Sequence, residues 1–136
     1  MVQPGFVEHV GTNTSGFRFD HHHWLAFAGL AEAGVRLAGS SDDPCAPSAP
    51  LWGADLGVLR RTAAGKEFEA EQSVPFLDWL TAYTTGAAYA GGQEHERGSF
   101  APGKLADLVV LDHATIGARV LQTWKRGDLV FSAAPA

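Results

Sequence analysis

The chain has 136 residues, enough for one domain with a hydrophobic core and too few for two substantial domains. Hydrophobic residues make up 46% of it and charged residues only 18%, a balance that excludes an intrinsically disordered chain. Its net charge of −5, with no dense block of Lys and Arg and no apolar run of membrane-spanning length, argues against nucleic acid or a membrane as the main partner.

The first forty residues predict a helix followed directly by a strand. Residues 6–10 form a short alternating patch after a Pro-Gly turn. Trp24, Phe27 and Ala31 recur at helical spacing, which predicts a helix over residues 21–33. The apolar run 35–38 then predicts a buried strand. A helix joined to a strand by so short a loop is typical of folds with alternating β and α elements.

Two carboxylates, Asp42 and Asp43, follow the predicted strand after three small residues, and Pro44 ends it. Acidic side chains just past the carboxyl end of a buried strand lie where α/β barrels carry their chemistry. An aspartate in this place can bind a metal, act as a general base, or cap the next turn. The pattern alone favours turn capping, because clusters of Ser, Asp and Pro are ordinary in turns.

Three other groups of side chains are candidates for chemistry. The adjacent histidines at 21–23 point in different directions on a helix, so they cannot all face one metal ion. His9 could face the same site as the aspartates, although a surface or packed histidine is the more frequent case. Cys45 has no evident base beside it and is interpreted as a small buried side chain. As the only cysteine, it excludes an internal disulfide and fits a reducing cytoplasm.

The middle of the chain predicts a further helix and an exposed polar segment. The helix is expected over residues 55–63, with Leu56, Leu59 and Arg60 on one side. Residues 65–72 are polar and are expected to be exposed.

The rest of the chain predicts a long helix and then strands. The helix is expected to begin after a cap at residue 73 and to end at residue 90, before two glycines. Its small side chains at 84–88 predict close packing against another backbone. Three strands follow, the last two joined as a hairpin, over residues 105–112, 120–125 and 129–131.

Several stretches together resemble the amidohydrolase superfamily. Gly39-Ser-Ser-Asp-Asp-Pro44 is similar to the G-S-D-x-P segment after the last barrel strand of these enzymes. Leu59-Arg-Arg-Thr62 and Ala82-Tyr-Thr-Thr-Gly-Ala-Ala-Tyr-Ala90 resemble the helix and the T-x-x-A-A segment that follow it. Gly98-Ser-Phe-Ala-Pro-Gly-Lys-Leu-Ala-Asp-Leu-Val-Val-Leu-Asp112 looks like the specific signature G-S-x-x-x-G-K-x-A-D-x-V-x-x-D. The matches run in order from about residue 2 to residue 131, and they resemble the branch of N-substituted formamide deformylases and related N-acyl amide hydrolases.

The resemblance implies a chemistry and a role for one residue. In this family the active site lies at the mouth of a (β/α)8 barrel, where a divalent metal, zinc above all, activates a water that attacks the C–N bond of a small-molecule amide. Asp42 matches the aspartate that binds the metal and carries the proton from the water to the leaving nitrogen. Asp43 falls on the variable position of the motif, so no role is carried over to it.

The departure from the family pattern limits what this chain does alone. The family's H-x-H pair, its mid-barrel lysine or acid and its two later histidines have no counterpart here, whereas a catalytic zinc needs about three protein ligands. The expected fold is α/β: a partial (β/α)8 TIM barrel, with its last two strands and helices over residues 1–95, and strands of a small composite β-sandwich over residues 96–136. We therefore expect the isolated chain to bind no metal stably and to be inactive.

Two alternatives from other classes stay open. The chain could be the C-terminal subunit of a split hydrolase, completed by the missing N-terminal part on a separate polypeptide. It could also be a non-catalytic remnant that folds alone, or as a self-associated oligomer, and acts as a binding or scaffold module. The apolar faces of residues 21–38 favour a partner, because a barrel wall left uncovered tends to associate.

Overall fold

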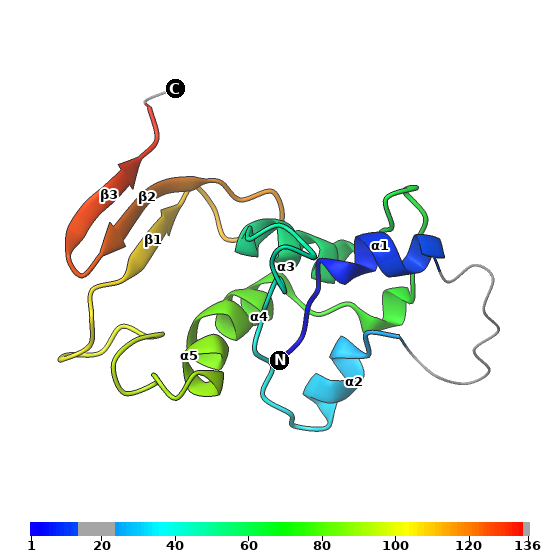
Figure 1. Cartoon of the computed structure of the whole chain (residues 1–136), viewed down its shortest axis with the longest axis horizontal. Helices are drawn as coiled ribbons and strands as arrows, with labels where there is room; N and C mark the ends of the chain where they lie inside the picture. Colours follow the sequence, from blue (N-terminus) through cyan, green and yellow to red (C-terminus); the bar gives the residue numbers. More distant parts are fainter. Residues whose placement is uncertain (14–23, 135–136) are drawn as a thin grey trace.

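The computed structural model describes residues 1–13 and 24–134. Short helices gather around one core, and a three-stranded antiparallel sheet extends from one end of this helical body (Figure 1). The elements in chain order are α1 (Phe6–Asn13), α2 (Phe27–Glu32), α3 (Pro50–Leu59), the 3-10 turn η1 (Ala70–Gln72), α4 (Phe76–Thr81), the π-helical turn η2 (Ala82–Gly86), α5 (Ala87–Ala90), β1 (Leu108–Leu111), β2 (Val120–Lys125) and β3 (Asp128–Ser132).

The core of the helical body is built on Trp79 of α4, which is completely buried. Its ring meets Phe27 of α2 edge-to-face, with 5.1 Å between centroids, and Val7 of α1 is buried in the same cluster. Gly57 of α3 makes room for the indole, because a Cβ atom there would lie 2.3 Å from it. Residues of α1, α2, α3 and α4 thus share one core, with Trp79 in contact with α2 and α3.

The helix expected at 73–90 is present as the continuous segment α4–η2–α5, which begins at Phe76. A π-helical turn interrupts it at Ala82–Gly86. The prediction of close backbone packing by its small residues is confirmed. A Cβ atom on Gly86 would lie 2.1 Å from the carbonyl oxygen of Leu37, and one on Gly98 would lie 2.6 Å from the methyl of Ala88.

Two predictions for the first forty residues are wrong. Residues 6–10 are helical rather than an alternating strand-like patch, because the turn at residues 3–5 starts α1 through its carbonyl groups. Residues 35–38 do not form a buried strand. Val35 is 49% exposed, and the only ladder pairing nearby in the described chain is an isolated parallel bridge between Val2 and Gly39. Because this extended segment pairs with only one short segment of the described chain, at Val2, its side chains stay partly exposed to solvent.

The helices before and after this segment are shifted from their expected bounds. The described part of the helix expected at 21–33 is α2, Phe27–Glu32, and the histidines at 21–23 lie outside the described residues. The helix expected at 55–63 is α3, which starts earlier because Pro50 is suited to a first helical position. It ends earlier because Arg60 takes a left-handed conformation with φ 49°.

The sheet has the order β1-β2-β3, with Leu108 opposite Trp124 and Trp124 opposite Leu129. The predicted hairpin is confirmed. Arg126 and Gly127, both at positive φ, make the tight turn between β2 and β3. Several apolar side chains of the sheet are about half exposed, among them Val109, Val130 and Phe131.

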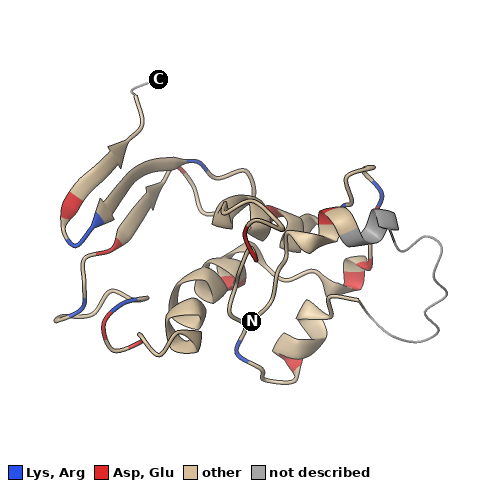
Figure 2. Cartoon of the chain, in the orientation of Figure 1, with Lys and Arg blue, Asp and Glu red and all other residues tan. Residues whose placement is uncertain are grey.

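The outer surface carries charges of both signs. In the view of Figure 2, the Lys and Arg residues are interspersed with Asp and Glu along loops and element ends. Within residues 1–13 and 24–134, no helix combines the length and hydropathy needed to cross a membrane.

Candidate active site

The candidate site begins where two extended segments run side by side in the same direction. The amide of Val2 donates to the carbonyl of Ala38 at 2.8 Å, and the amide of Ser40 donates to the carbonyl of Val2 at 2.9 Å. These two bonds make the parallel bridge between Val2 and Gly39. Since the segments are parallel, the residues that follow each of them leave at the same end. In α/β folds this carboxyl end is where sites are built.

Asp42 lies three residues beyond the bridge, in a turn that holds its backbone and leaves its side chain exposed. Its amide donates to the hydroxyl oxygen of Ser40 at 3.3 Å, and its carbonyl accepts from the amide of Cys45 at 2.8 Å. Its φ of 57° is left-handed, a conformation that Asp and Asn tolerate better than most residues. The structure therefore combines both uses of the motif, a tight turn and an outward carboxylate.

Tyr83 of η2 lies under this turn. Its hydroxyl donates to the carbonyl of Ser40 at 3.5 Å, a long hydrogen bond. Burial raises the pKa of Tyr83 to about 12, so the phenol stays protonated at neutral pH and acts as a donor. The sequence predicted that Tyr83 lies in a helix but gave no signal that it meets residues 39–40, because that contact spans more than forty positions.

The other candidate side chains do not join Asp42 in a cluster. Asp43 and Cys45 are exposed, so the expectation of a buried cysteine is wrong, and the reason is that residues 42–45 form a surface turn. His9 is 53% exposed on α1, with its Nε2 3.9 Å from a carboxylate oxygen of Glu8. In the described part of the chain no three His, Cys, Asp or Glu side chains gather in a way that could hold a metal ion. Asp42 offers one ligand, and a catalytic metal would need its others from residues outside the described set.

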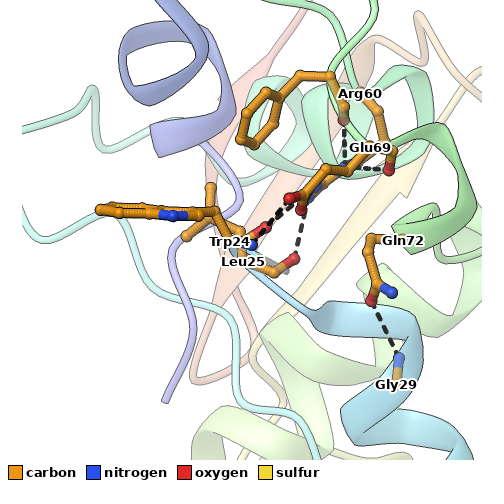
Figure 3. A network of polar contacts seen from close by, with 7 residues as sticks. Trp24, Leu25, Gly29, Arg60, Glu69 and Gln72 are labelled. Carbon is orange, nitrogen blue, oxygen red and sulfur yellow. Dashed lines mark hydrogen bonds and ion pairs between the residues drawn. The ribbon is translucent and has the colours of Figure 1, made fainter. Parts of the chain in front are cut away.

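A second polar group, which the sequence did not predict, is the buried network around Arg60 (Figure 3). Its guanidinium is completely buried and donates to the carbonyls of Trp24, Leu25, Phe68 and Glu69, at 3.1 to 3.3 Å. It also pairs with the Glu69 carboxylate at 3.4 Å. Burial lowers the pKa of Arg60, and the nearby acids Glu69 and Glu71 oppose this shift.

The same segment holds the start of α2. The other carboxylate oxygen of Glu69 accepts from the amide of Trp24 at 2.9 Å, and the side-chain oxygen of Gln72 accepts from the amide of Gly29 at 3.1 Å. Gln72 is only 6% exposed, so the expectation of an exposed segment at 65–72 fails at the residues that face α2. These hydrogen bonds fix the start of α2 against the segment at residues 69–72.

The polar residues of the signature at 98–112 hold loops in place. The ammonium of Lys104 donates to the hydroxyl of Ser99 at 2.8 Å and to the carbonyl of Glu94. Asp107 accepts from the amide of Arg126 in the β2–β3 turn, at 2.9 Å. Asp112 accepts from the backbone amide and the Nε of Arg119, at 2.8 and 2.9 Å. These side chains thus stabilise the loop that precedes β1 and the connections between the strands.

Asp112 gives these loops a pH dependence. The amide of Arg119, its guanidinium and the neighbouring His113 lower the pKa of Asp112 from 3.8 to about 2. Because the folded-state pKa is the lower one, the stabilisation is complete above about pH 4 and is lost as the pH falls toward 2. We expect Asp112→Asn to lower the thermal midpoint at neutral pH, and the gap from wild type to close between pH 4 and 2. Thermal melts of both chains across this range check it. The control is Asp128→Asn, at the exposed first residue of β3, and a gap as wide at pH 2 as at neutral pH would contradict the prediction.

Comparison with known proteins identifies the family. The amidohydrolase family model matches residues 2–131. The N-substituted formamide deformylase of Arthrobacter pascens is 36% identical over 121 residues, covering 81% of this chain and 22% of that protein. The protein YtcJ of Bacillus subtilis is 34% identical over 90 residues, covering 64% of this chain and 17% of that protein. The chain thus spans about a fifth of the length of these curated relatives.

A solved structure agrees with the sequence match. The amidohydrolase of Thermotoga maritima superposes with a TM-score of 0.61 at 27% identity, over 79% of this chain and 26% of that protein. The segment that carries Asp42 and the signature at 98–112 both lie inside the range that the family model matches. The chain belongs to the amidohydrolase family.

Proposed function

We propose that this chain supplies the aspartate of a metal-dependent amidohydrolase active site that cleaves the C–N bond of a small amide, with N-substituted formamides as the first substrate class to test. The observation that carries the proposal is the exposed carboxylate of Asp42, three residues past the parallel bridge of Val2 and Gly39. The turn also lies within residues 2–131, which the amidohydrolase family model matches, and this supports the proposal. A reducing cytoplasm is the proposed setting, since Cys45 is a free and exposed thiol.

The proposed architecture divides the chain at about residue 95. Residues 1–95 would be the last two βα units of a (β/α)8 barrel, and residues 96–136 would be strands of a small β-sandwich. The parallel bridge supports the first part, because it joins two extended segments that are each followed by helices. The antiparallel order β1-β2-β3 supports the second part.

Asp42 would have two tasks in the complete site. It would be one ligand of a divalent metal, for which we propose zinc, and the other ligands would come from outside this chain. The bound metal would supply the acidity that makes water a nucleophile at neutral pH. Asp42 would accept a proton from this water as the water oxygen bonds to the amide carbon, and would then give it to the nitrogen as the C–N bond breaks. The products are a carboxylic acid and an amine.

Exposed apolar side chains favour a partner that completes the fold. Leu77 on α4 is 59% exposed, and Val130 and Phe131 on β3 are 58% and 48% exposed. Large apolar side chains that are this exposed on both the helical body and the sheet are consistent with surfaces that another polypeptide covers. We therefore propose that the isolated chain is inactive, and that its partner is the missing N-terminal part of an amidohydrolase, in the same polypeptide or as a separate subunit.

A chimera tests the proposed function. Residues 2–131 would replace the matched region of the Arthrobacter pascens deformylase, and formate release from an N-substituted formamide would be followed with added zinc and with a chelator. We expect turnover that needs the metal, and none from the isolated chain or from the deformylase truncated before the matched region. A chimera that folds and binds zinc but releases no formate would refute the substrate class. Turnover on mixing the isolated chain with the truncated enzyme would favour a split enzyme.

A further inference from the structure

We propose that Tyr83 is a positioning residue for Asp42, acting through the face of its ring on Gly39. The inference rests on the proposed role of Asp42, and it assigns to Tyr83 no contact with substrate or metal. Its basis is a short path of contacts that leads from η2, in the helical body, to the exposed turn at residues 40–45.

The first step of the path is the contact between Tyr83 and Gly39. A Cβ atom on Gly39 would lie 2.8 Å from three carbons of the Tyr83 ring, so the ring lies directly against the backbone of the glycine. The amide of Gly39 also donates to the carbonyl of Ala82 at 3.0 Å. Two adjacent residues of η2 thus fix the backbone of Gly39, one by packing and one by a hydrogen bond.

The second step runs from Gly39 to Asp42 through Ser40. The carbonyl of Ser40 accepts from the Tyr83 hydroxyl, and its side-chain oxygen accepts from the amide of Asp42 at 3.3 Å. Because the bond from the hydroxyl is 3.5 Å long, we assign the larger share of the positioning to the ring and the smaller share to the hydroxyl. A shift of the ring would move residues 39 and 40 and, through them, the turn that carries the carboxylate.

The third observation is that a second glycine lies against the hydroxyl end of Tyr83. A Cβ atom on Gly53 of α3 would lie 2.3 Å from the Tyr83 hydroxyl oxygen. The ring of Trp79, the residue at the centre of the core, lies 6.5 Å away between centroids. Tyr83 is therefore in close contact with α3 at its hydroxyl and with the 39–40 segment at its ring, and a glycine provides the space at each contact.

The test adds a methyl group at each of these two contacts with Tyr83. Gly39→Ala and Gly53→Ala each force the ring to move, and Gly29→Ala is the matched control, because its Cβ atom would meet only the side-chain oxygen of Gln72 at 3.7 Å. Amide hydrogen exchange over residues 39–45 is measured in the full 136-residue chain. Turnover is measured in the chimera with the deformylase, where a misplacement of about 1 Å can lower kcat by about 10²-fold.

We expect Gly39→Ala to speed exchange at residues 39–45 and to lower kcat by about 10²-fold with KM nearly unchanged. Gly53→Ala should act in the same direction and should be rescued by Tyr83→Phe, which removes the hydroxyl and keeps the ring. Gly29→Ala should change neither exchange nor kcat.

Normal exchange and normal kcat in both Gly39→Ala and Gly53→Ala would overturn the positioning role, as would a failure of Tyr83→Phe to rescue Gly53→Ala. If Asp42→Asn keeps its turnover, the proposed function fails instead. The exchange data would still decide whether Tyr83 sets the turn, so the two failures can be told apart.

Discussion

Replacing Arg60 with methionine is expected to lower the free energy of unfolding by about 3–5 kcal/mol, the range for breaking a buried ion pair from one side. The guanidinium is completely buried and is bonded to four backbone carbonyls and to Glu69. It also lies over the rings of Phe27 and Phe68, at 5.2 and 5.5 Å from their centroids. Methionine is a flexible apolar side chain that keeps contact with the rings but leaves the carbonyls without donors, at a cost for each buried acceptor. Urea unfolding of both chains measures the difference.

The matched control is Arg61→Met, one residue along the chain and exposed. Loss of the Arg61 side chain should change the free energy of unfolding by less than about 0.5 kcal/mol, the usual range for a surface substitution. Equal effects at both positions would show that charge in general, rather than this network, stabilises the fold. An Arg60→Met chain as stable as wild type would show that the carbonyls find water or other donors.

The same network explains backbone conformations that the sequence could not predict. Leu25, Arg60 and Glu69 all have left-handed φ, between 48° and 56°, although none is glycine. Such residues cost of order 1 kcal/mol each and persist where their surroundings determine them. Here the surroundings are the Arg60 network. The Arg60 guanidinium donates to the backbone carbonyls of Leu25 and Glu69, so all three left-handed residues belong to the same set of hydrogen bonds. A local sequence rule ends a helix at glycine, whereas α3 ends at an arginine held by long-range bonds.

Predictions that depend on short-range patterns agree best with the structure. The Arg-Gly turn correctly predicted the β2–β3 hairpin. The small residues at 84–88 correctly predicted a close backbone approach, which the structure shows between Gly86 and Leu37. The family assignment also succeeded, because the residues that carried it are spread along nearly the whole chain. Within the signature at residues 98–112, Lys104 and Asp112 make the loop contacts described above.

Predictions that needed knowledge of neighbours agree less well. Residues 35–38 have the composition of a buried strand, yet Val35 is half exposed because the described chain supplies one short parallel neighbour, at Val2. Cys45 was expected to be buried from its residue type, but the turn that exposes Asp42 exposes it as well. The turn around Asp42 could be predicted from the Ser, Asp and Pro residues of its motif. The support beneath it, from Tyr83, could not, because it comes from a helix more than forty residues away.

Asp42→Asn in the chimera is expected to lower kcat by about 10²–10⁴-fold, the share that a positioned proton carrier contributes. Asparagine is the informative replacement, because it tolerates the left-handed φ of 57°. The backbone N–H of residue 42 can still donate to the Ser40 hydroxyl oxygen. The change therefore removes the negative charge and the proton acceptor while the turn keeps its shape. Steady-state formate release, together with the zinc content of the purified protein, separates the loss of proton transfer from the loss of a ligand.

The neighbouring residue supplies the control. Asp43 is also exposed and acidic, so Asp43→Asn removes the same charge one position away. We expect it to keep turnover close to that of the unmodified chimera, because the family motif assigns no role to this position. If Asp43→Asn abolishes turnover and Asp42→Asn does not, the proton carrier is Asp43 and the proposed role of Asp42 is wrong. The contacts that lead from Tyr83 through Ser40 would then position residue 42, next to the catalytic aspartate rather than the catalytic aspartate itself.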